Sequence, residues 1–123
     1  MTTMIQDKDG VIAAVPSTKP SDRHFRNAWV FDSSQSAITE DITEAKVIFK
    51  DKIREVRGPL LEAEDVVYMK ALEADDATAK AASVAKKKKL RDAPAASAIT
   101  NAVNITALKA AWDEDVLGTS PYK

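Results

Sequence analysis

A chain of 123 residues is long enough for one domain with a small hydrophobic core. Eighteen basic residues balance nineteen acidic ones, and this near-zero net charge argues against general binding to nucleic acid or to a membrane surface. The lack of cysteine excludes disulfides and thiolate metal sites.

The first 40 residues predict two β-hairpins. The β-prone runs TTMIQ and VIAAV flank DKDG, a turn with glycine last, which predicts a hairpin over residues 2–15. A second hairpin is expected over residues 25–40, because DSSQS is turn-like, AITE can return and FRNAWVF alternates, which places Phe25, Trp29 and Phe31 on one strand face. We assign residues 1–40 to a β-rich segment and leave open whether residues 1–20 belong to the core or form an arm.

From Asp41 the hydrophobic period changes to that of a helix. DITE is a capping-box pattern, in which Asp41 accepts from the Glu44 amide and Glu44 reaches back. Apolar side chains then recur every three or four residues, which predicts a helix over residues 41–57 with a stripe formed by Ile42, Ala45, Phe49, Ile53 and Val56.

Glycine and proline at positions 58 and 59 predict that this helix ends and that a second begins, over residues 59–74. One continuous, kinked helix is the alternative. The expected stripe of the second helix is Leu60, Ala63, Val67 and Ala71, with Leu61, Tyr68 and Leu72 beside it.

A third helix is expected over residues 77–92, because alanine and lysine dominate it. Residues 62–76 hold six acids and one lysine, whereas residues 77–91 hold six bases and no acid. A tight turn between the two helices would place the acidic helix antiparallel to the basic one, so we expect a helical hairpin.

The last helix is predicted over residues 104–117, and PAASAIT before it as a short helical turn. Asn104 is the expected N-cap, Gly118 ends the helix, and the stripe is Ile105, Leu108, Trp112 and Val116. Residues 119–123 are read as a tail. The predicted fold class is α+β, predominantly α, with N-terminal β-hairpins followed by an antiparallel helical bundle over residues 41–118.

No pattern in the chain predicts catalysis, a metal or a cofactor. The sole histidine, His24, could act as a general base only for a nucleophile, and the chain has no cysteine and no serine in a nucleophile motif. The DKDG segment lacks the glutamate that a calcium-binding loop requires. Three scattered glycines exclude a phosphate-binding loop. We interpret acid pairs such as Glu62 and Glu64 as solvated helix surface, and the four consecutive lysines as a solvated face opposite the acidic helix.

The stretch SDRHFRNAWVFD, residues 21–32, concentrates aromatic residues and arginines. Its rings are either the core of the β part or a docking surface, because aromatic residues and arginine carry much of the binding energy at protein interfaces. On the second interpretation the partner-binding residues are Arg23, Phe25, Arg26, Trp29 and Phe31.

Three blocks, PSDRHFRNAWVFD, EAKVIFKDKIREVRGPLLEAEDVVYMKALE and KKKKLRDAP, follow one another over residues 20–95. In this order they resemble small proteins encoded beside tail-fibre genes in bacteriophages and prophages, including tail-fibre assembly and tail-assembly chaperone proteins. Those proteins often carry an aspartate followed by tryptophan in the middle block, whereas here Val66 follows Asp65.

The resemblance implies a structural or adaptor protein of the phage tail, made in the host cytoplasm and located in the virion. Its expected partners are other tail or tail-fibre proteins and symmetry copies of itself, with no nucleic acid, membrane or cofactor. A transient assembly chaperone that leaves before the particle is finished is the alternative. A small nucleic-acid-binding regulator that uses AKKKKLRDA is a third possibility.

Overall fold

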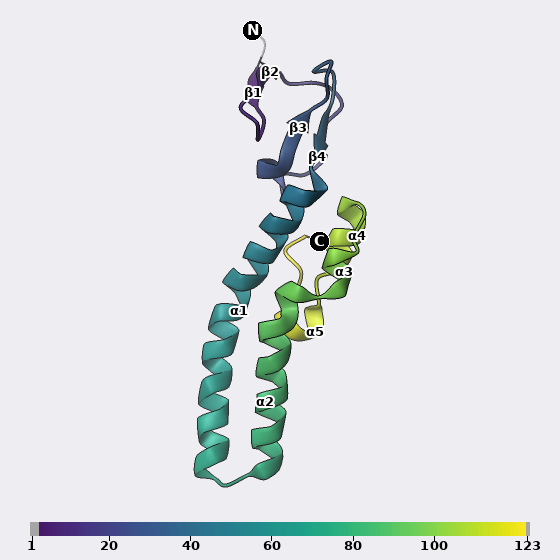
Figure 1. Cartoon of the computed structure of the whole chain (residues 1–123). Helices are drawn as coiled ribbons and strands as arrows, with labels where there is room; N and C mark the ends of the chain where they lie inside the picture. The colour runs from purple at the N-terminus through teal and green to yellow at the C-terminus, as the bar shows by residue number, and fades with distance from the viewer. Residues whose placement is uncertain (1–2, 123) are drawn as a thin grey trace.

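Two β-hairpins precede a series of helices in the computed structural model, which describes residues 3–122 (Figure 1). The strands are β1 (Met4–Gln6), β2 (Ile12–Ala14), β3 (Trp29–Phe31) and β4 (Ile38–Glu40). The α-helices are α1 (Ile42–Glu73), α2 (Ala77–Asp92), α3 (Ser97–Thr100), α4 (Ile105–Ala110) and α5 (Glu114–Leu117), with 3-10 turns η1 (Arg26–Ala28) and η2 (Ala93–Ala95). This order confirms the predicted fold class, α+β with helix predominant.

The first hairpin lies within the range that the sequence predicts, although residue 2 is outside the described residues. β1 and β2 pair antiparallel, with Met4 opposite Ala14 and Gln6 opposite Ile12. Gly10 adopts φ +85° in the turn, a backbone conformation that side chains disfavour.

The second hairpin is shorter than predicted, because only β3 and β4 form its ladder. The residues expected to start its first strand form the 3-10 turn η1 instead, and the Ala28 amide donates to the Phe25 carbonyl. The prediction that Phe25 shares a strand face with Trp29 and Phe31 is therefore wrong. Phe25 packs into the helical core, whereas the other two rings pack under the first hairpin.

Helix α1 begins where the capping pattern predicts, since the Asp41 carboxylate accepts from the Thr43 and Glu44 amides at 3.0 and 3.4 Å. The Asp41 amide donates to the Ala28 carbonyl instead of to a Glu44 side chain. The helix then runs unbroken through Pro59, so the predicted end at positions 58 and 59 is wrong and the continuous alternative holds. Core packing of Val56 before the proline, and of Leu60 and Leu61 after it, offsets the lost helical hydrogen bond.

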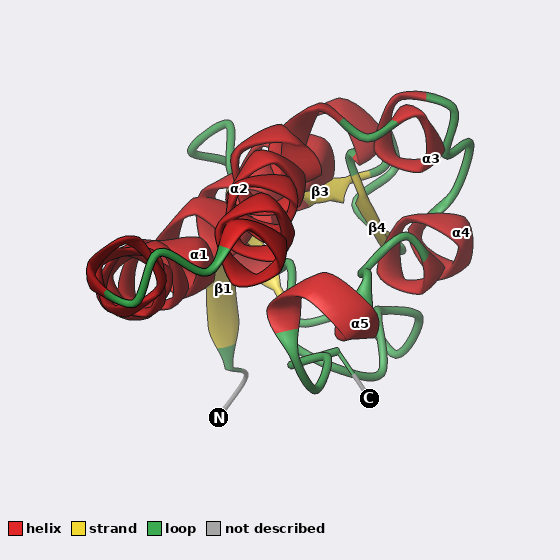
Figure 2. Ribbon diagram, turned by 90° about the horizontal axis from the view of Figure 1, so that it is seen from below, coloured by secondary structure: helices red, strands yellow, loops and turns green. Residues whose placement is uncertain are grey.

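Helices α1 and α2 lie side by side and antiparallel, as the charge segregation predicts (Figure 1). The end of this helical pair extends beyond the rest of the molecule. We call residues 59–92, which comprise the second half of α1 and all of α2, the arm, and the remaining described residues the head. Viewed along the arm, α3, α4 and α5 gather on one side of the α1–α2 pair (Figure 2).

The buried stripe of α1 within the arm is not the predicted one. Ala71 is buried as expected, but Ala63, Val67 and Leu72 are exposed, and Glu64 is buried in their place. The seam with α2 therefore runs along Glu64 and Ala71.

The predicted C-terminal helix is interrupted. Asn104 caps α4 as expected, accepting from the Ala107 amide, but the helix stops before Trp112. Asp113 then caps α5 by accepting from the Asp115 amide, and this second cap, missed in the sequence, explains the break. Gly118 ends α5 as predicted, with φ +84°. The short helical turn predicted before α4 is present as η2 and α3.

The main core lies between the first half of α1 and the C-terminal helices. Its fully buried large side chains include Phe25, Phe49, Ile53, Leu90 and Leu108. The residues predicted as a tail contribute to it, because Tyr122 packs against this core; residue 123 is outside the described residues. The interpretation of the C-terminal segment as a tail is therefore corrected up to Tyr122.

Candidate interaction surfaces

The three aromatic rings proposed as docking residues face inward. Phe25 is fully buried, and only 2 % of Trp29 and 8 % of Phe31 is exposed. Phe25 stacks on Tyr122, whereas Trp29 and Phe31 form a small second core with Ile38. Of the two interpretations of this stretch, the core holds for the aromatic rings, and their assignment as partner-binding residues is corrected.

The two arginines of the stretch lie over Trp29 at the surface. The Arg23 guanidinium is 5.4 Å from the centre of the indole ring and that of Arg26 is 4.8 Å away, so both cations contact its π face. Arg26 also donates to the Gln6 carbonyl at 2.7 Å and thereby joins η1 to the first hairpin. Arg23 is exposed and Arg26 half-buried.

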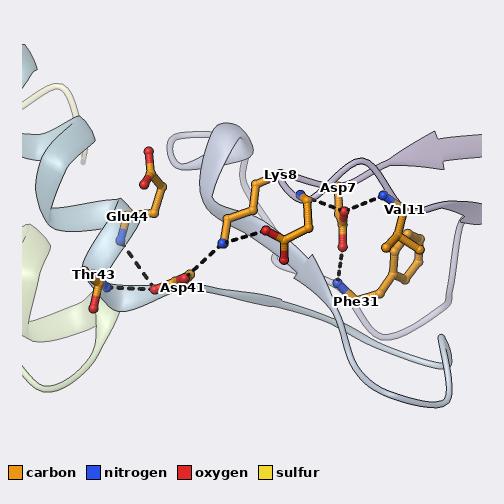
Figure 3. Close-up of polar contacts among 8 residues, drawn as sticks. Asp7, Lys8, Val11, Phe31, Asp41, Thr43 and Glu44 are labelled. Carbon is orange, nitrogen blue, oxygen red and sulfur yellow. Dashed lines mark hydrogen bonds and ion pairs between the residues drawn. The ribbon is translucent and has the colours of Figure 1, made fainter.

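Asp7 fastens the first hairpin to the second (Figure 3). One of its carboxylate oxygens accepts from the Asp9 and Val11 amides, each at 2.9 Å, and closes the turn. The other oxygen accepts from the Phe31 amide at 3.0 Å. This bond to Phe31, more than the others, lowers the pKa of Asp7 below its usual value, because all three amides favour the charged carboxylate. The DKDG segment is thus a structural turn that also anchors β3.

Lys8 continues this connection to the start of α1 (Figure 3). Its ammonium lies 3.1 Å from Asp9 and 3.3 Å from the helix cap Asp41, and these carboxylates raise the pKa of Lys8. Its amide donates to the Trp29 carbonyl. The first hairpin is therefore positioned on the head by polar contacts as well as by packing.

The outer face of the first hairpin carries exposed apolar side chains. Met4 and Ile12 are 57 % and 62 % exposed, and the register places both on one face of the ladder with Ala14 and the polar Gln6. Large apolar side chains gathered on one exposed face mark an interaction surface more often than single ones do.

A cluster of charged residues lies beside the second hairpin. Asp22 pairs with Lys109 at 2.5 Å, and this pair lowers the pKa of Asp22. Burial, and then the nearby Asp22 carboxylate, raises the pKa of Glu40. His24 lies at the surface, 3.5 Å from Asp22 and edge-on to Tyr122. No group of three metal-ligating side chains occurs within residues 3–122.

The hollows of the surface are open grooves. One, of about 650 Å³, lies where the arm meets α5; its apolar lining includes Ile53, Ala96 and Leu117, and Lys88 and Asp113 are among its polar residues. Another, of about 610 Å³, is polar and lies beside the Asp7 turn, lined by Gln6, Asp7, Lys8, Arg26, Asn27 and Glu44. Both suit contact with a side chain of a partner better than enclosure of a small molecule.

The arm exposes large apolar side chains along its length. Each is about half exposed: Val66, Val67, Met69 and Leu72 on α1, and Val84 on α2. The sequence places Val67 and Leu72 in or beside a buried stripe, so their exposure is visible only in the structure. Within the described residues, no helix is long and apolar enough to cross a lipid bilayer.

Comparison of the chain with protein-family models, with curated proteins and with solved structures finds no match.

Proposed function

We propose that this chain is a structural or adaptor component of a bacteriophage tail, which acts by binding other tail or tail-fibre proteins rather than by catalysis. The similarity of its blocks over residues 20–95 to small proteins encoded beside tail-fibre genes motivates the phage setting. The exposed apolar face of the first hairpin, with Met4 and Ile12, is the observation that supports docking as its mode of action.

The first hairpin also offers its backbone to a partner. Within the described residues, β2 pairs with β1 and with no third strand, so its outer edge presents unpaired N–H and C=O groups, whereas Arg26 occupies the Gln6 carbonyl on the outer edge of β1. A strand from a tail protein that adds to such an edge gains main-chain hydrogen bonds, and side-chain pockets give it specificity. Asp7, Lys8 and Arg26 hold the hairpin in place beforehand, which lowers the entropy cost of docking.

The contacts of the lysine run favour this function over a nucleic-acid-binding regulator. Three of its four lysines pair with carboxylates of the chain itself: Lys86 with Glu64, Lys87 with Asp65, and Lys88 with Asp92. A phosphate backbone would have to compete with these acids, and the balanced net charge adds no long-range attraction.

The experiment that tests the proposal asks whether the chain is present in purified phage particles. Quantitative mass spectrometry of particles from the encoding phage or prophage is expected to find it in a fixed ratio to the tail proteins. In the same assay, Ile12→Glu is expected to lower incorporation, whereas Val103→Glu, at an exposed position outside the first hairpin, leaves it unchanged.

Two outcomes contradict the proposal. If the chain is abundant in the producing cell but absent from finished particles, the transient chaperone is favoured instead. If Ile12→Glu and Val103→Glu are incorporated equally well, the first hairpin is not the docking surface.

A further inference from the structure

The arm lacks a core of its own. Its buried positions are Glu64, Ala71, Ser83 and Leu90, of which only Leu90 is a large apolar side chain, and that residue packs on the head. Helices of this length are marginally stable in water unless an apolar face is covered. The five exposed apolar side chains of the arm are therefore available for burial by a binding partner.

Three of these five share one face of the arm. Lys87 pairs with Asp65 at 2.6 Å and lies over the Tyr68 ring, so these three residues mark the same side of the α1–α2 seam. Met69 follows Asp65 by four positions, Leu72 follows Tyr68 by four, and Val84 precedes Lys87 by three. All three side chains therefore lie on this side of the seam. We call the surface marked by Met69, Leu72 and Val84 the Leu72 face.

Val67 lies on the opposite side of the seam. It follows Glu64 by three positions and precedes Ala71 by four, so it borders the buried row on the flank away from Leu72. Its exposed fraction is 48 %, against 46 % for Leu72. The two side chains therefore flank the same seam equally, and Val67 serves as a matched control.

The charges of the arm indicate what covers the Leu72 face. Residues 59–92 carry seven acids and seven bases, and six of the acids precede residue 77 whereas six of the bases follow it. A partner must therefore offer positive charge to α1 and negative charge to α2. A uniformly charged surface meets only half of this requirement, but a second copy of the arm meets all of it when its α2 lies across α1 and its α1 across α2.

The two flanks of the seam differ in this respect. On the Leu72 face, α2 carries the bases Lys80, Lys88 and Arg91, of which Lys80 and Lys88 also pair within the chain with Asp75 and Asp92. The acids Glu62 and Glu73 border the face on α1. On the Val67 flank, lysines lie on both helices, namely Lys70 on α1 and Lys86 and Lys89 on α2, so a second copy would meet like charge. Charge complementarity thus selects the Leu72 face for self-association.

We propose that two copies of this chain associate through the Leu72 faces of their arms to form a four-helix bundle. The apolar side chains Met69, Leu72 and Val84 fill the space between the two hairpins, and the acidic α1 of each copy lies against the basic α2 of the other. The contact is isologous, because the same surface serves both copies, so it closes at two and leaves both heads free. This inference does not depend on the phage setting.

The test is the molar mass of the full-length chain measured by sedimentation equilibrium over a range of concentrations. The wild type, of 13.4 kDa, is expected to reach twice that mass at high concentration. Leu72→Glu is expected to raise the dimer dissociation constant by about tenfold or more, because it buries a carboxylate in the contact. Val67→Glu leaves the constant unchanged. A chain that stays monomeric at every concentration, or two variants that weaken association equally, overturns the proposal.

A charge exchange tests the same contact without relying on the apolar positions. Lys88→Glu with Arg91→Glu gives α2 the sign of α1, and Glu62→Lys with Glu73→Lys gives α1 the sign of α2. Each double variant alone is expected to dissociate more readily than the wild type, and an equimolar mixture of the two restores the dimer as a heterodimer. A mixture that remains as weak as its components contradicts the assigned pairing of α1 with α2. Circular dichroism of every variant verifies that the helices are retained.

Discussion

Phe25 and Tyr122 stack face to face, with ring centres 5.1 Å apart and an angle of 11° between the ring planes. Tyr122 stacks on Phe49 as well, at 5.3 Å and 21°, and meets the edge of Trp112. The last residues of the chain thus close over the core formed by η1 and α1. Burial of this ring raises the pKa of Tyr122 to about 12.

The raised pKa of Tyr122 predicts a loss of stability at alkaline pH. The folded chain holds the Tyr122 proton more tightly than the unfolded chain does. The stabilisation that comes from the protonated ring is therefore fully present below about pH 10 and is lost as the pH rises through about 12. Tyrosinate absorbance of the folded chain is expected to show a step near pH 12. Tyr122→Phe should remove that step and flatten the alkaline decline of the melting temperature. If the step survives in the Tyr122→Phe variant, it does not arise from Tyr122.

Glu40→Gln is expected to stabilise the protein at neutral pH. The folded pKa of Glu40 is raised, first by burial and then by Asp22, so the charged carboxylate costs stability as the pH rises from the unfolded value through the folded one. Within the described residues, neither the buried Glu40 Oε2 nor the buried Nε1 of its cross-strand partner Trp29 has a hydrogen-bond partner. The variant should melt at a higher temperature than the wild type at pH 7, and the difference should shrink at pH 4.

The opposite result for Glu40 has a clear meaning. A Glu40→Gln variant that melts lower than the wild type at pH 7 would show that the charged form is favoured in the fold, in conflict with its raised pKa.

Asp7→Asn is expected to destabilise the β part more than Asp9→Asn does. Asp7 is buried and receives three backbone amides, whereas the Asp9 side chain is 56 % exposed and pairs with Lys8. The pKa of Asp7 is lowered, so its contribution is present above the unfolded value of 3.8 and is lost as the pH falls through the folded value. In thermal melts, the difference between the Asp7 variant and the wild type should be larger at pH 7 than at pH 3. Equal melting temperatures for the two variants would contradict the anchoring role of Asp7.

Gly58→Ala tests the continuity of α1. Gly58 lies inside the helix, and apart from its chain neighbours an added Cβ meets nothing within 4 Å, so alanine is expected to gain up to about 0.5–1 kcal/mol. Contact between that Cβ and the following Pro59 ring reduces this gain. A helix that ended at this glycine in a left-handed conformation would instead be destabilised by the same change. Chemical denaturation of the two proteins distinguishes the cases by the sign of the difference.

Local signals in the sequence predict where elements begin. Asp41 and Asn104 are predicted as N-caps, and both cap helices in the structure. Asp76, which is not predicted as a cap, caps α2 in the same way. The hairpin turns and the antiparallel arm were also predictable, because turn chemistry and charge segregation act between neighbouring segments.

Features that depend on distant contacts were not predictable. Alternation favours a strand at Phe25, but packing against Tyr122, 97 positions later, draws this residue into the helical core. Proline predicts a break at position 59, but core contacts on either side keep α1 whole. In the arm, apolar spacing predicts burial of Val67, yet Glu64 and Ser83 are buried at the seam, where the Ser83 hydroxyl donates to the Glu64 carbonyl.

The most direct test of docking through the first hairpin is site-specific photo-cross-linking during particle assembly. A photoreactive residue at Ile12 is expected to form a covalent adduct with one particular tail or tail-fibre protein, and the same residue at Val103 should not. Adducts with nucleic acid, or a pattern of adducts identical at the two positions, would contradict the account.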